Sequence, residues 1–330
     1  MKKIVLPTLA FLLLAAPAWA CDICGCFMGI TPYDNQSGFS IMHRYRVFNG
    51  YQLLGQRHRL FPTGVQPFFP SNPNSDTGYK HSHQGDPTDY EAYRVVELRG
   101  KYFLAKRLEL NAFVPYVMNT TQSNGQQLNV AGVGDITVFA GYHLIRNIET
   151  LGIQSRLIVG GGVKFPTGDY RRTNADGQRY AMLNQVGTGT TDGFVYANYI
   201  GSLHSFGLSV NASYRRTTRN SFQNSIAPSA TNFATLFYRL PLGPNWQVYP
   251  SAQFYYERTK GEMLDGQLTH EHEMNDALLG PGLDVYYKNF SLNTSVQLPV
   301  YTALTDHPAS AGRIVLAVGY SLKQTKYLVK

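Results

Sequence analysis

Charge is scarce in this sequence, because Asp, Glu, Lys and Arg together make up only 15% of its 330 residues. Amphipathic helices need Glu, Lys and Ala on their solvent faces, so an α-rich fold is disfavoured. Cysteine is also rare, with three residues that all lie within the first 26 positions. Tyr and Gly are abundant instead, with 23 and 31 residues, and a hydrophobic content of 43% is too high for a disordered chain. This mixture favours strands with one polar face.

Long apolar runs are absent after residue 20, which excludes a membrane-spanning helix there. The first twenty residues differ. Lys2 and Lys3 precede an apolar run from Ile4 to Ala16, and Ala18-Trp19-Ala20 forms a small-x-small cleavage site. The run is shorter than the ~20 residues of a spanning helix, so we interpret residues 1–20 as a signal peptide rather than an uncleaved anchor. The mature chain then begins at Cys21, outside the cytoplasm.

Apolar and polar residues alternate with a period of two along most of the remaining chain. Leu208 to Arg215 alternates strictly, and Phe290 to Val300 places its apolar residues on one side and Ser, Asn and Gln on the other. The pattern predicts twelve strands, over residues 39–48, 90–104, 108–118, 134–145, 153–165, 193–203, 208–215, 231–242, 246–258, 277–288, 290–300 and 313–323.

The predicted connections alternate in length. The long ones cover residues 49–89, 119–133, 166–192, 216–230, 259–276 and 301–312, and the short ones cover 105–107, 146–152, 204–206, 243–245 and 289. Outer-membrane barrels have this asymmetry, with tight periplasmic turns on one rim and long outer loops on the other. In hydrocarbon an unpaired backbone group costs several kcal/mol, so a sheet there must close on itself.

We therefore predict an all-β fold in which residues 38–330 form a single transmembrane antiparallel up-and-down β-barrel of about 12 strands. A Cys-rich periplasmic leader at residues 21–37 precedes it. The predicted location is the bacterial outer membrane. The alternative is a soluble periplasmic β-sandwich, but its strands are usually only about five or six residues long.

The alternation also assigns the two faces of the wall. Leu108, Leu110, Val114 and Tyr116 are typical of the side that faces lipid. The alternate register points charged residues into the lumen: Arg44, Arg46, Arg99, Lys101, Arg156, Lys164, Arg215, Arg239, Lys288, Arg313 and Lys323 as bases, and Glu97, Glu109, Asp135, Glu257 and Asp284 as acids. The predicted lumen is thus polar and on balance basic. It is either a weakly anion-attracting passage or a filled interior whose charges pair with one another.

Three glycine-containing motifs occupy the middle of the chain. They are Gly132-Val133-Gly134-Asp135 with the strand after it, Lys164-Phe165-Pro166-Thr167-Gly168-Asp169, and Val186-Gly187-Thr188-Gly189-Thr190. They resemble the GxGD strand, the K-x-P-T-G-D strand end and the GTG segment of the outer-membrane family named for the meta-pathway of phenol degradation. The resemblance implies a twelve-stranded barrel that carries small molecules. It does not imply a phenol substrate.

All three cysteines lie in the leader, as Cys21, Cys24 and Cys26. Thiolates at CxxCxC spacing can converge on one soft ion, and Cu(I) or Zn(II) would suit three sulfur ligands. Two other readings stay open. Two of the cysteines can form a disulfide in an oxidising compartment, or Cys21 can carry a lipid anchor, although Ala18-Trp19-Ala20 lacks the usual Leu at minus three.

Histidines recur at HxH spacing in the predicted outer loops, as His81 with His83 and His270 with His272. On an extended segment both imidazoles of an HxH pair point the same way, which suits metal capture. Solvated loop histidines are the simpler interpretation. Together with the cysteines, these residues suggest a route for a transition metal.

Two functions from different classes follow from these patterns. The first is an outer-membrane channel or transporter for a small-molecule or metal solute; the second is a closed metal-binding or structural barrel without transport. An enzyme is not expected, because the GxSxG, Walker, GxGxxG and HExxH motifs are absent, and His43 is a lone candidate for a lipase-type site. Nucleic acid is not an expected partner. The expected partners are lipid, the lipopolysaccharide phosphates near Arg171, Arg172 and Arg219, and a periplasmic partner at the leader.

Overall fold

The computed structural model describes residues 36–49, 90–123, 125–147, 153–173, 177, 179–243, 245–265, 267–268, 274–304 and 310–322. Among these residues, no helix is long and apolar enough to cross a membrane. The predicted signal peptide and nearly all of the leader lie outside the described residues.

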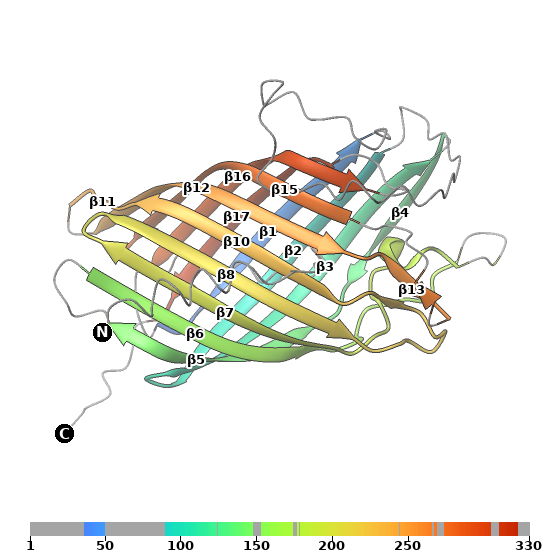
Figure 1. Ribbon diagram of the computed structural model, residues 1–330, viewed down its shortest axis with the longest axis horizontal. Helices are drawn as coiled ribbons and strands as arrows, with labels where there is room; N and C mark the ends of the chain where they lie inside the picture. Colours follow the sequence, from blue (N-terminus) through green and yellow to red (C-terminus); the bar gives the residue numbers. More distant parts are fainter. Residues whose placement is uncertain are drawn as a thin grey trace, which may run out of the picture.

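The described residues form one closed, antiparallel β-barrel of twelve strands, with β4 and β5 counted as one interrupted strand (Figure 1). Each strand pairs with its neighbours in the chain, and the ring is closed where β1 pairs with β17. The predicted fold class is therefore confirmed. The barrel strands are β1 (Gly38–Asn49), β2 (Tyr90–Ala105), β3 (Leu108–Ser123), β4 (Gln126–Val133), β5 (Thr137–Asn147), β6 (Ile153–Lys164), β7 (Asp192–Leu203), β8 (Phe206–Thr217), β10 (Ser229–Tyr238), β12 (Trp246–Thr259), β15 (Met274–Tyr287), β16 (Phe290–Leu304) and β17 (Ser310–Ser321).

The connections differ between the two rims as the sequence predicts. The short-turn rim holds the ends of β1 and β17 and tight turns such as the one between β2 and β3. The opposite rim, called here the long-loop rim, holds the 3-10 helix η1 (Met182–Asn184) and the small strands β9 (Ser225–Ile226), β13 (Glu262–Leu264) and β14 (Gln267–Leu268). The remaining strand, β11 (Leu240–Pro241), pairs with β12 near the short-turn rim.

The second of the predicted long connections differs from the sequence-based prediction. Residues 119–133 were expected to form an outer loop, but β3 continues to Ser123 and pairs with β4 as a hairpin. β4 ends at Val133, and after a break at residues 134–136 the chain re-enters the same ladder as β5. Polar residues such as Gln126, Gln127 and Asn129 concealed this strand from an apolar-periodicity search, because they point into water on both faces.

The outer face of the barrel is a continuous apolar band. Large hydrophobic side chains there stay exposed, and Ile41, Leu98, Leu208, Leu292 and Leu316 are examples from five strands. Water would disfavour such a large exposed apolar surface, whereas hydrocarbon tolerates it once every backbone group is paired around the ring. The protein is therefore an outer-membrane β-barrel.

Aromatic rings cluster on the outer face at the short-turn rim. Phe39 and Phe290 both pack on Tyr320, with ring centroids 5.8 and 5.0 Å away, and Trp246 packs on Tyr287 at 4.4 Å. Tyr and Trp favour the membrane–water interface because one end of each ring system is polar. These rings mark where one interface of the bilayer meets the barrel.

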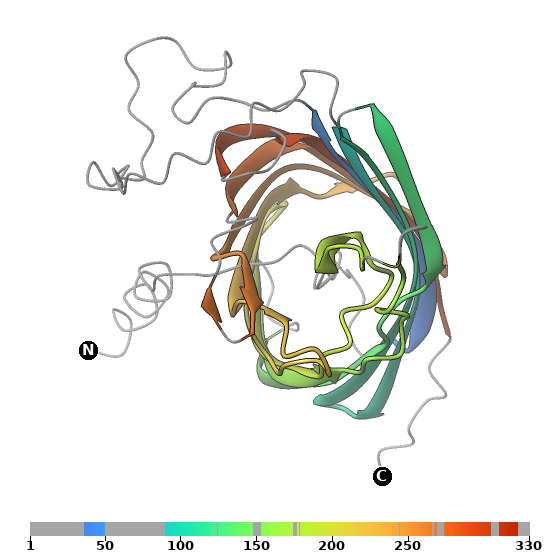
Figure 2. The ribbon, with the colours of Figure 1, turned by 90° about the vertical axis from the view of Figure 1, so that its right-hand side faces the viewer.

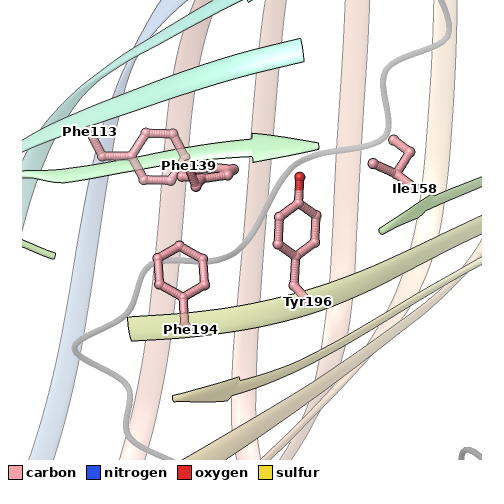
Figure 3. Close-up of a cluster of buried hydrophobic side chains, with 5 residues drawn as sticks. All are labelled: Phe113, Phe139, Ile158, Phe194 and Tyr196. Carbon is pink, nitrogen blue, oxygen red and sulfur yellow. The ribbon is translucent and has the colours of Figure 1, made fainter. Parts of the chain in front are cut away.

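The inner face is packed with aromatic and charged side chains. On one wall, Phe139 lies edge-on to Phe113, Phe194 and Tyr196, with centroids 4.9 to 5.7 Å apart (Figure 3). Ile158 completes this cluster, which draws on β3, β5, β6 and β7. Across the barrel, Phe233, Tyr255 and Leu278 form a second cluster. Phe233 thus faces inward, and half-buried His43 lies on the outer face between apolar cross-strand neighbours.

Candidate functional site

Most of the predicted lumen residues lie buried inside the barrel. Ten of them are at most 9% exposed: Arg44, Arg46, Glu97, Arg99, Glu109, Asp135, Arg156, Lys164, Arg215 and Asp284. Lys101 is less buried and lies 3.7 Å from the Glu109 carboxylate. Arg313 and Glu257 are buried as well, whereas Lys323 lies outside the described residues.

Two predicted lumen residues are instead exposed near the short-turn rim. Arg239 lies in the break between β10 and β11, and Lys288 lies in the turn between β15 and β16 with a φ of 52°. The inner-wall register does not extend through a break or a turn, so these two side chains are not part of the packed inner wall. The sequence pattern had been extended past the ends of both strands, since β10 ends at Tyr238 and β15 at Tyr287.

The lumen is also more acidic than predicted. Buried carboxylates that the sequence analysis missed are Glu91, Asp192, Glu262 and Asp276. Asp192 and Asp276 had been assigned to outer loops, although each continues the inward positions of its strand. With them, nine buried acids face seven buried Arg and Lys among the described residues. The expectation of a basic lumen is therefore wrong.

A four-residue ion cluster joins three strands and the break after β4. Lys164 Nζ lies 2.7 Å from Asp135 Oδ2 and 2.9 Å from Asp192 Oδ2, and Arg215 Nη1 lies 3.3 Å from the same Asp192 oxygen. All four side chains are nearly inaccessible to water. A buried charge is costly unless it is paired, and here two cations face two carboxylates. We call this group the Asp135 cluster.

The Asp135 cluster brings the three glycine motifs together. Asp135 accepts hydrogen bonds from the backbone N–H groups of Gly168 and Thr188, each at 3.0 Å, and from Thr188 Oγ1 at 2.8 Å. A Cβ on Gly187 would lie 2.5 Å from the carbonyl group of Gly168. Two of the motif glycines are therefore required by close backbone contact.

A second ion cluster lies on the opposite side of the lumen. Arg46 on β1 pairs with Glu257 on β12 and with Asp276 on β15, where its Nη2 lies 2.8 Å from Oδ2. Tyr255 donates a hydrogen bond of 2.9 Å to Glu257. These contacts connect strands that β16 and β17 separate in the sheet.

A cavity of about 130 Å³ lies in the long-loop half of the barrel. The segment from Met182 to Thr188 forms one side of it, and Figure 2 shows this connection between β6 and β7 lying within the ring of strands. Charged residues at its edge include Arg46, Glu97, Asp135 and Lys164. Its apolar lining residues are Phe48, Val95, Pro115, Val117, Met182, Leu183, Val186, Ile226 and Met274. We call it the upper cavity.

A second cavity of about 150 Å³, the lower cavity, lies toward the short-turn rim along the same three strands β1, β2 and β3. Its polar lining includes Arg99, Glu109, Asn111 and His143. His143 Nε2 lies 3.1 Å from Glu109 Oε2. Glu97 lines the upper cavity and pairs with Arg99, which lines the lower one, so this ion pair lies where the two cavities approach each other.

The family of the chain is set by a match over residues 86–315, which is more than half of its length. The matching family model is described as "Putative MetA-pathway of phenol degradation". The chain belongs to this family. All three glycine motifs lie within the matched range, and in the barrel they form one buried cluster.

Solved structures of other outer-membrane barrels are similar to this one. The COG4313 outer membrane channel from Pseudomonas putida F1 has a TM-score of 0.59 and 13% sequence identity, over 89% of this chain and 100% of that chain. The β domain of the Bordetella autotransporter Brka has a TM-score of 0.47 and 13% identity, over 88% of this chain and 100% of that chain. At 13% identity the likeness to the COG4313 channel shows the fold alone. No curated protein sequence matches this chain.

The predicted metal ligands cannot be placed by the structure. Cys21, Cys24, Cys26, His81, His83, His270 and His272 all lie outside the described residues. Within the described residues, no group of three or more His, Cys, Asp or Glu side chains is arranged to hold a metal ion.

Proposed function

We propose that this barrel is a channel that passes a small solute between the cell exterior and the periplasm. The observation that supports it is the stacking of the two cavities along β1, β2 and β3, from the long-loop half to the short-turn rim. A barrel that served only as a membrane anchor would not need a cavity in each half. We propose the Glu97–Arg99 pair, which lies between the cavities, as an inner constriction of this path, in addition to any at its mouth.

The upper cavity favours an uncharged and largely apolar solute. Its charged groups already have partners, since Arg46 pairs with Asp276, Lys164 with Asp135, and Glu97 with Arg99. An ionised solute would lose hydration without gaining an unpaired counter-charge. A cavity of about 150 Å³ in another protein holds benzene, so the upper cavity suits a molecule of about one ring. The family description agrees with this size class.

Electrical recording tests the channel directly. The purified mature protein should give discrete conductance steps in planar lipid bilayers. Relative to protein-free liposomes, proteoliposomes should speed the entry of phenol more than the entry of benzoate at pH 7. Met182→Trp should fill the upper cavity and slow phenol entry, whereas Leu316→Trp, on the lipid face, should leave it unchanged. Silent bilayers together with impermeable proteoliposomes would favour the closed structural barrel instead.

We also propose a role in transition-metal handling through Cys21, Cys24 and Cys26. Its support is the sequence spacing alone, which suits Cu(I) or Zn(II). Because β1 begins at the short-turn rim, we expect the leader that precedes it to be available to a solute or a periplasmic partner on that side. Purified wild-type protein should retain copper or zinc that the Cys21/Cys24/Cys26→Ser variant lacks. Thiol titration and intact mass then identify a disulfide or a lipid if neither protein holds metal.

At the long-loop rim we propose lipopolysaccharide as a partner of the exposed bases Arg171 and Arg219. Guanidinium groups bind phosphate with two hydrogen bonds. Arg171→Gln with Arg219→Gln should weaken co-purification of lipopolysaccharide, and unchanged co-purification would contradict the assignment.

A further inference from the structure

The segment from Met182 to Thr188 lies inside the mouth of the barrel, where contacts with the wall and with the rest of its own connection hold it. Gln185, for example, exchanges hydrogen bonds with the backbone of Arg172. Asn119 Nδ2 donates to the Leu183 carbonyl at 3.4 Å, and Thr121 Oγ1 donates to Asn184 Oδ1 at 2.9 Å. Met182 packs on Ile226 at the near end, and the buried hydrogen bonds lie at the far end, where Thr188 meets the Asp135 cluster. We call this segment the mouth segment.

One carboxylate ties both ends of the connection that contains the mouth segment. Asp135 accepts a hydrogen bond from Gly168, just after β6, and two from Thr188, just before β7. Lys164 donates to both Asp135 and Thr188. Gly168 and Thr188 are thus held together at Asp135, and we call this closed base of the connection the neck. Asp135 itself lies in the break between β4 and β5 and is anchored to the wall.

We propose that Asp135 is the positioning residue that holds the mouth segment across the lumen and so sets the width of the passage. This inference rests on the proposed channel function. The reason is that a single carboxylate makes all of these contacts, through both of its oxygens. An Asn at this position has only one acceptor oxygen and a donor in place of the other, so it cannot accept from both Gly168 and Thr188. Removing the acceptor leaves buried donors unpaired, so the neck opens.

The first measurement is hydrogen exchange of the folded protein in detergent micelles. In Asp135→Asn, peptides that cover residues 182–188 should exchange about tenfold faster, because a buried hydrogen bond to a charge is lost. Thr188→Val removes only the hydroxyl contacts and should act in the same direction by a smaller factor. Thr188→Val also tests the proposal if Asp135→Asn fails to assemble.

Asp169→Asn is the matched control. Asp169 lies in the same connection but is exposed, and its bonds to Arg171 N–H and Arg172 hold its pKa below the ordinary value, so it too is charged at neutral pH. Asp169→Asn removes the same charge but leaves the hydrogen bonds to Asp135 in place, and the backbone carbonyl of residue 169 still accepts from the Gly187 N–H. Exchange at residues 182–188 should stay at the wild-type rate. Equal exchange in wild type, Asp135→Asn and Thr188→Val would overturn the proposal.

The second measurement is single-channel conductance, which a purely stabilising role would not move. Asp135→Asn should conduct about twofold more than wild type, and Asp169→Asn should match wild type, because the width of a constriction limits flow. If no protein conducts while exchange still rises in Asp135→Asn, the channel function fails and the positioning role stands. If wild type and Asp135→Asn conduct equally and exchange alike, the positioning role fails alone.

Discussion

Arg46 reaches Asp276 inside the barrel, 2.8 Å from Nη2 to Oδ2, although 230 positions separate the two residues in the chain. The same guanidinium pairs with Glu257, and all three side chains are at most 3% exposed. Arg46→Met should lower the free energy of unfolding by ~3–5 kcal/mol, because it leaves two buried carboxylates without their cation. Urea unfolding in detergent micelles measures this loss.

The matched variant removes all three charges at once. Arg46→Met with Glu257→Gln and Asp276→Asn should recover most of the lost stability, since no buried charge is left unpaired. Equal destabilisation in the single and triple variants would mean that packing of the Arg46 side chain matters more than its charge.

Gly160 lies where an aromatic ring covers the backbone of β6. A Cβ there would lie 2.2 Å from the Ala140 carbonyl oxygen and 2.6 Å from Tyr196 Cε1. Gly160→Ala should therefore destabilise the barrel by ~1–3 kcal/mol through overpacking. At Gly193, on the adjacent strand, a Cβ meets nothing within 4 Å, so Gly193→Ala should leave the urea midpoint unchanged. A neutral Gly160→Ala would show that both the Ala140 backbone and the Tyr196 ring can move away without cost.

Trp246 reports the depth of the short-turn rim in the membrane. The sequence has two tryptophans, and the other, Trp19, lies in the predicted signal peptide. In the mature chain, Trp246 should be quenched more by lipids brominated near the headgroup than by lipids brominated near the chain end, because it belongs to an interface girdle. Leu316→Trp in a Trp246→Phe background should show the reverse order. Deep quenching of Trp246 would contradict the proposed position of the membrane.

The Glu97–Arg99 pair should control passage between the cavities. Glu97→Ala with Arg99→Ala removes two long side chains from the inner constriction, so conductance should rise about twofold. Thr120→Ala with Asn129→Ala, which removes an exposed hydrogen bond of 2.9 Å in the projecting hairpin, is the matched double variant and should conduct as wild type does. Unchanged conductance in the first variant would place the inner constriction elsewhere.

Sequence periodicity was sufficient to predict the architecture. Strands that separate lipid from a polar lumen must alternate apolar and polar side chains. The alternation from Leu208 to Arg215 therefore predicted both the strand and the face to which each side chain points. The twelve predicted strands correspond to the twelve barrel strands, with ends that differ by a few residues except at the fourth, where all of β4 was missed. The inward register of Arg46, Asp135 and Lys164 followed from the same rule.

Which charged side chains pair with one another inside the lumen could not be predicted in this way. Periodicity gives the direction of a side chain but not the diameter of the ring, so it could not show that Arg46 meets Asp276 across three strand boundaries. Asp192 was missed because the predicted strand began one residue late, whereas β7 begins at Asp192 itself. Its partners Thr190, which donates a hydrogen bond to it, and Lys164 have no local signature. The polar strand β4 was missed because it lacks apolar alternation.

The two ends of the barrel are direct neighbours, since Gly38 pairs with Ser321 and Leu322 N–H donates to the Ser37 carbonyl at 2.7 Å. Among the described residues, the first and last strands of the wall therefore meet at a single boundary, between β1 and β17. A circular permutant that links residue 322 to residue 36 and begins at Arg107 would retain every ladder of the wall. Its new ends would leave from the same rim as the old ones, which makes the tight turns suitable points for inserting reporters without disturbing the mouth.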